Sequence, residues 1–161
     1  MTLDSRWKHK YGTLKNFILS EPGIYIRPTE SHIPPGLRDR FYGYFDDVRM
    51  AIVESWCGSS RLDLFALSKN YQESEGKLAE SLNLKVELPT DLSSILHNPK
   101  GGMMRLLYNR LFELIQGKIS ENDFEKMVEV DLETRATEMF QLGYETWAAL
   151  ALVNLLEPDE L

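Results

Sequence analysis

Three histidines and one cysteine are the residues of this 161-residue chain that most often act as metal ligands or nucleophiles. His9, His32 and His97 are far apart in sequence. None of them belongs to a Glu-x-x-His or His-x-x-x-His pair, which would place two ligands on one helix face. A single cysteine cannot supply the thiolates of a typical zinc site. We therefore expect no metal site and no cofactor.

Cys57 lies at the predicted C-terminal end of a helix, beside Gly58. The negative end of a helix dipole disfavours the thiolate that a nucleophile requires. Ser5 to Lys8 and Ser74 to Lys77 both match Ser-x-x-Lys, but no Lys-Thr-Gly partner motif is present. We predict no catalytic residue, and an enzyme that uses carboxylates or an unrecognised site is our least favoured hypothesis.

An Asn-Pro-Lys-Gly-Gly segment over residues 98–102 opens a predicted helix. Backbone amides, glycines and a lysine at a helix start could bind a phosphate or carboxylate. The other interpretation, which we favour, is a helix cap followed by glycines that allow close packing. The residues of this possible anion site are Asn98, Lys100, Gly101 and Gly102.

Acidic residues recur every four positions from Glu121, through Glu125 and Glu129, to Glu133. On a helix they form one ridge, in which neighbouring like charges repel. A solvated face is our first interpretation, and a basic partner that binds this acidic ridge is the second. Further along, Arg135 is spaced to pair with Asp131 or Glu138 near the apolar edge of the helix.

Aromatic residues are concentrated between residues 41 and 56. Phe41, Tyr44, Phe45 and Trp56 share one helix face, so we expect a packed core, whereas Tyr42 points elsewhere. A small-molecule pocket lined by aromatic side chains is the alternative.

The charge is uneven along the chain, which has a formal net charge of −7. Residues 113–161 carry 12 acidic and 3 basic side chains. This balance argues against nucleic acid as a partner, because affinity for phosphates requires clustered Lys and Arg. The start of the chain is charged and is followed by no apolar core, so we expect no signal peptide, no membrane segment and a cytoplasmic location.

Apolar residues at spacings of three and four predict a mostly all-α fold of five or six helices, with room for one short two-stranded β element. The β element would pair residues 24–27 with 84–88, where apolar and polar residues alternate. We expect a single domain over residues 1–161, with an N-terminal arm (1–35) and a helical core (36–157). Two lobes that meet near residues 84–90 are the alternative. The first predicted helix covers residues 36–57. The second extends from a cap at Ser60 to residue 83 and bends or breaks at Gly76. The others are 91–96, 99–116, and 121–157, with a bend or break at Gly143 and a stop at Pro158.

The segment from Trp147 to Leu156 is apolar almost all round. Such a helix is either central in the fold or part of an interface. We therefore predict a non-enzymatic module that docks a partner protein or self-associates, for example as a homodimer. A helical small-molecule-binding or sensor domain is the alternative. The possible interface residues are Tyr144, Trp147, Leu152, Val153 and Leu156.

Overall fold

The structure, a computed structural model, describes residues 3–59 and 63–156. Within these ranges it confirms a mostly helical fold with one small two-stranded sheet, and it contains seven α-helices where five or six were expected. The elements in chain order are α1 (Arg6–Ser20), β1 (Tyr25–Ile26), β2 (Ser31–His32), the 3-10 helix η1 (Pro35–Leu37), α2 (Arg38–Ser59), α3 (Leu64–Leu82), α4 (Thr90–His97), α5 (Pro99–Leu106), α6 (Tyr108–Ile115) and α7 (Glu121–Leu155).

The chain forms two compact units, and each is assembled from two separate segments of the sequence. Unit 1 contains residues 3–59 and 104–132, and unit 2 contains residues 63–103 and 133–156. Helix α7 therefore contributes its first twelve residues to unit 1 and the rest to unit 2. That residues 1–161 behave as one domain stays a prediction.

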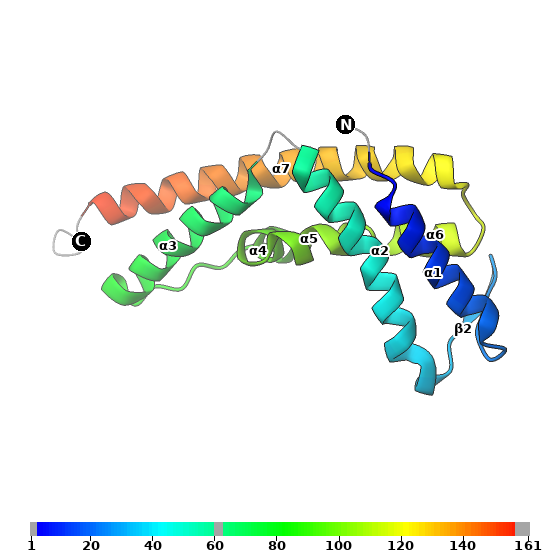
Figure 1. Cartoon of the computed structure of the whole chain (residues 1–161). Coiled ribbons are helices and arrows are strands. Elements are labelled where there is room, and N and C mark those ends of the chain that lie inside the picture. Colours follow the sequence, from blue (N-terminus) through cyan, green and yellow to red (C-terminus); the bar gives the residue numbers. More distant parts are fainter. Residues whose placement is uncertain (1–2, 60–62, 157–161) are drawn as a thin grey trace. The chain divides into compact units, whose positions relative to one another are not determined.

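Unit 1 is built on α1 and α2, which lie side by side (Figure 1). The aromatic core expected from the sequence is confirmed for Phe41, Phe45 and Trp56, which are almost fully buried. Trp7 on α1 packs against Phe124 at the start of α7, with ring centroids 5.0 Å apart. Large apolar side chains from two distant segments of the sequence thus fill one core.

An arginine in this unit explains why the predicted helix over 99–116 is divided at Leu107. Arg49 donates from Nη1 to the backbone oxygen of Met104 at 3.1 Å, and the same oxygen accepts from the amide of Leu107. The guanidinium lies over the rings of Phe45 and Tyr108 and is paired with Asp46. Because the carbonyl of Met104 has these two donors, the regular helical pattern is interrupted there.

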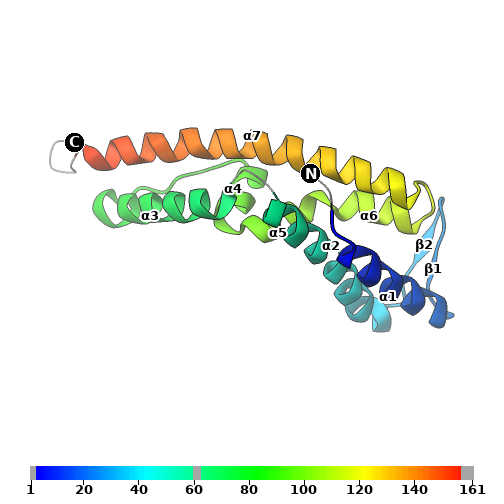
Figure 2. The same cartoon turned by 45° about the horizontal axis from the view of Figure 1, so that its top comes forward.

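The sheet is a local hairpin rather than the predicted long-range pair. Tyr25 pairs with His32 and Ile26 with Ser31, in an antiparallel arrangement drawn clearly in Figure 2. The strand predicted at 24–27 is therefore confirmed, whereas residues 84–88 form no strand. A partner five residues away closes a much shorter loop than one sixty residues away, so it costs less entropy.

Unit 2 is built from α3, α4, the start of α5 and the C-terminal part of α7. Helix α3 begins at Asp63, whose carboxylate accepts from the amide of Ala66 at 2.9 Å. The cap predicted at Ser60 and the stop predicted at Pro158 lie outside the described residues. The break that Gly76 could introduce does not occur, because α3 continues through this exposed position.

The break predicted at Gly143 is also wrong, because α7 is one helix of 35 residues. Gly143 is buried, and a Cβ there would lie 2.9 Å from Leu96 Cδ2 and 3.0 Å from Leu67 Cδ2. The glycine allows close packing against α3 and α4 instead of ending the helix. This close contact fixes which face of α7 is turned inward in unit 2.

Candidate interaction surface

The C-terminal part of α7 has an inner and an outer face in unit 2. Ala136, Met139, Gly143 and Leu150 form the inner face and are buried. Towards its C-terminal end the opposite side is apolar as well, yet it is uncovered within the described chain. The exposed large apolar side chains outside the inner face are Leu142, Tyr144, Leu152, Leu155 and Leu156, with exposed fractions between 47% and 77%.

The outer face has the spacing of a helix-packing seam. Glu145, Ala148, Leu152 and Leu155 follow one another at steps of three, four and three residues. Steps of three and four keep side chains on one stripe, which is the pattern by which one helix packs against another. We call these four residues, together with Leu156, the outer seam.

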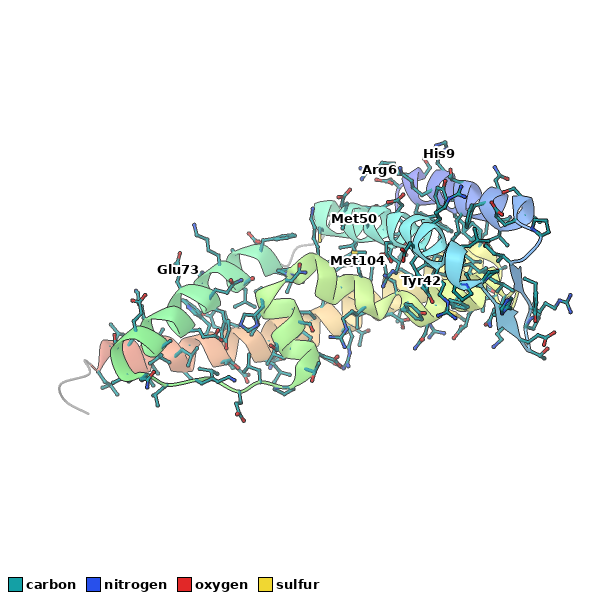
Figure 3. All side chains as sticks on the ribbon, turned by 90° about the horizontal axis from the view of Figure 1, so that it is seen from below. Arg6, His9, Tyr42, Met50, Glu73 and Met104 are labelled. Carbon is teal, nitrogen blue, oxygen red and sulfur yellow. The ribbon has the colours of Figure 1, made fainter. Side chains whose placement is uncertain are left out.

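A groove runs between α3 and α7 within unit 2, where the two helices lie alongside each other (Figure 1). It has a volume of about 450 Å³ and is open rather than enclosed. Asn154 crosses it and donates to the backbone oxygen of Ser74 at 3.3 Å. Polar side chains line the α3 side, among them Glu73, labelled in Figure 3, and Lys77, whereas Trp147, Ala151, Val153 and Leu155 line the α7 side.

The five predicted interface residues therefore lie in two places. Tyr144, Leu152 and Leu156 belong to the exposed face, whereas Trp147 and Val153 are half-buried and line the groove. The sequence could not separate these positions, because every side of this helix segment is apolar.

The acidic ridge at the start of α7 is partly occupied by the chain itself. In unit 1, Glu125 accepts from Trp7 Nε1 at 2.9 Å and lies 3.6 Å from Lys8 Nζ. Glu129 accepts from the backbone amide of Leu3 at 3.2 Å. One lysine and two uncharged donors from the start of the chain thus engage the middle of the ridge, whereas Glu121 and Glu133 are exposed.

Asn98 accepts hydrogen bonds from two backbone amides that an anion bound at this helix start would need. Its Oδ1 accepts from the amide of Gly101 at 3.2 Å, and its backbone oxygen accepts from Gly102 at 2.8 Å. Gly102 is buried against Ile95, where a Cβ would lie 2.7 Å from Cγ1. Half-buried Lys100 follows in the same turn. This geometry matches the cap-and-packing interpretation of the segment.

A cluster around His97 in unit 2 was missed by the sequence analysis. His97 Nε2 lies 3.1 Å from Glu75 Oε1 on α3, and Nδ1 lies 2.8 Å from the backbone oxygen of Ser93 and 3.1 Å from its Oγ. The four-residue spacing of Ser93 and His97 is visible in the sequence. Glu75 precedes His97 by 22 residues, so only the fold brings it close.

The electrostatics of this cluster favour an ion pair over a catalytic triad. Burial alone would lower the pKa of His97, but hydrogen bonds to Glu75 and to the Ser93 carbonyl outweigh it and raise the pKa. Both ring nitrogens face acceptors, so the imidazolium is the preferred form and has no lone pair to accept a proton from Ser93. The cluster therefore ties α4 to α3 at the end of α4, where the helix dipole also favours a cation.

Arg135 forms a second link between helices of unit 2. It donates to Asp91 on α4 at 2.9 Å and to Glu138 at 3.2 Å. Its predicted pairing with Glu138 is thus confirmed, while Asp131 pairs in unit 1 with Arg110 at 2.9 Å.

A second groove lies in unit 1 between α1 and α2, with a volume of about 460 Å³. Figure 3 labels Arg6 and His9 on its α1 side and Met50 on its α2 side. Asp47 and Glu54 bring negative charge to the α2 side, so the groove combines both signs and selects no single ligand class.

Among the described residues, no group of three or more His, Cys, Asp or Glu side chains is placed to hold a metal ion. In the same part of the chain, no helix combines the length and the apolar character that crossing a membrane requires. Comparison of the chain with protein families, with curated proteins and with solved structures found no match.

Proposed function

We propose that this protein is a non-enzymatic interaction module that docks a helix onto the outer face of α7. The observation that carries the proposal is the outer seam, because Leu152 is 64% exposed on the side opposite the buried face, and Leu155, which also borders the groove, is 77% exposed. Contiguous apolar surface of this kind is typical of sites that another protein covers.

The spacing of the seam indicates the shape of what it binds. Side chains at steps of three and four form a straight ridge along a helix, and such a ridge packs best into the grooves of a second helix. Half-buried Ala148 and exposed Ala149 keep the backbone accessible to close approach. Covering one leucine would contribute about 1.5–3 kcal/mol to binding.

The test uses Leu152→Glu in the full chain. We would measure mass against concentration by sedimentation, and titrate fluorescent helical peptides that share a leucine seam and differ in charge. We expect the wild type to bind a peptide or to self-associate, and the variant to lose about tenfold or more in affinity.

Ala79→Glu on exposed α3 is the matched control, because it adds the same charge away from the outer seam. It should leave binding unchanged. A wild type that neither self-associates nor binds any of the peptides would refute the proposed function.

The open groove between α3 and α7 favours a second candidate, a small-molecule-binding domain. Its volume suits a small ligand, and Trp147 offers an aromatic surface beside the polar side chains of Asn70 and Glu73. Native and denaturing mass spectra of the purified protein test this candidate. An extra mass that is lost on denaturation, and that Trp147→Ala abolishes, would support it, whereas a bare native mass would count against it.

A further inference from the structure

The charges beside the outer seam indicate what kind of helix it binds. From residue 136 to 161 the sequence contains no Lys or Arg, whereas Glu138 and Glu145 are seven residues apart and lie in one line with Leu152. Both glutamates are exposed. The face is therefore apolar at its C-terminal end and acidic at its N-terminal end.

The two glutamates have only modest neutralisation from within the chain. Glu138 shares Arg135 with Asp91, at distances of 3.2 Å and 2.9 Å from the guanidinium nitrogens. Glu145 lies beside the uncharged amide of Gln141, with Nε2 and Oε1 3.5 Å apart. A partner that covers this face must compensate these carboxylates or lose binding energy to them.

A second copy of the chain is a poor occupant of the outer seam. In a parallel pair, Glu145 of one copy would face Glu145 of the other. In an antiparallel pair, the carboxylates of one copy would meet no lysine or arginine of the other, because residues 136–161 contain neither.

We propose that the occupant is an amphipathic helix of another protein, with an apolar stripe against Leu152 and Leu155 and Lys or Arg opposite Glu138 and Glu145. This inference rests on the proposed docking function and adds the charge of the partner. Oppositely charged side chains then meet along the N-terminal part of the stripe, and apolar side chains meet along its C-terminal part. The contribution of the charged pairs weakens as the salt concentration rises.

The test compares two synthetic helical peptides with the same leucine seam. One carries Lys and the other Glu at the two positions that face Glu138 and Glu145. Because the Lys peptide can form two exposed ion pairs, we expect the wild type to bind it about tenfold more tightly than the Glu peptide at low salt. Fluorescence anisotropy measures both affinities. Glu145→Lys should remove this preference, and Glu80→Lys, the same exchange on exposed α3, should leave it intact.

The outcomes separate the two proposals. Equal affinity for both peptides, with loss of binding in Leu152→Glu, would overturn the basic partner and retain the docking function. A wild type that is dimeric, and that Leu152→Glu makes monomeric, would assign the seam to a second copy and also overturn the basic partner. Absence of both peptide binding and self-association would overturn the docking function itself.

Discussion

Two glycines of unit 2 predict opposite effects of the same substitution. Gly76 lies in the middle of α3, where an added methyl group would have nothing within 4 Å, whereas the corresponding methyl at Gly102 would meet backbone atoms of Ile95. Gly76→Ala should therefore stabilise the protein, and Gly102→Ala should destabilise it. Each serves as the control for the other, because both add one methyl group to a helix of the same unit.

The magnitudes follow from helix propensity and packing. Alanine is favoured over glycine inside a helix by about 1 kcal/mol, which applies at both positions. At Gly102 the new Cβ would lie 2.9 Å from both Cα and the amide nitrogen of Ile95. Backbone atoms cannot rotate away, so we take the upper end of the overpacking cost, about 3 kcal/mol. Gly102→Ala should thus lose about 2 kcal/mol net.

Thermal unfolding followed by circular dichroism measures both effects. For a chain of this size 1 kcal/mol corresponds to about 2–4 °C in Tm. We expect Gly76→Ala to raise Tm by about 2–4 °C and Gly102→Ala to lower it by about 4–8 °C. Equal shifts of Tm with the same sign would show that the contact with Ile95 is not what makes glycine necessary at position 102.

Three further predictions concern polar contacts. The pKa of His97 is raised and the pKa of Glu75 is lowered in the folded state. Their ion pair therefore stabilises the protein fully below pH 6.5, as far down as Glu75 stays ionised, and is lost as the pH rises through the raised pKa of His97. His97→Gln should flatten the pH dependence of the unfolding free energy above pH 6.5, and an unchanged profile would contradict the ion pair. Trp7→Phe removes the donor to Glu125 and should lower the unfolding free energy by about 1–2 kcal/mol in a urea titration, whereas no change would mean that water replaces the indole. Asn98→Ala removes a helix cap and should lower the unfolding free energy by about 1 kcal/mol. Added phosphate should leave the wild-type Tm unchanged. A phosphate-dependent rise in Tm that Asn98→Ala abolishes would instead support an anion site.

Local signals in the sequence predicted much of the fold. Ser120 caps α7 by accepting from the amide of Asp123 at 3.1 Å, and Gly117 follows α6 with a φ of 75°; serine and glycine are the residue types that favour these two positions. The stripe of apolar residues over 36–57 located α2 to within two residues at each end. In each case the information lies within a few residues of the element that it determines.

Contacts between distant segments account for the errors. Gly143 indicated a break because glycine weakens an isolated helix, but in the fold the side-chain ends of Leu67 and Leu96 pack closely against it and would have to shift to admit a Cβ. The division at Leu107 depends on Arg49, which lies 58 residues earlier. Of the candidate site, the sequence identified the apolar helix end but not its outer face, because that distinction depends on which side α3 and α4 cover.

The interleaving of the two units along the sequence has a consequence for synthesis on the ribosome. Phe124, Val128 and Leu132 are fully buried in unit 1, yet they follow α2 by more than sixty residues. Synthesis proceeds at about 5–20 residues per second, so roughly 3–15 s pass between the synthesis of α2 and the synthesis of these side chains. The indole of Trp7 remains uncovered by Phe124 throughout that interval. Both units include residues of α7, so neither can complete its core until this helix has been synthesised.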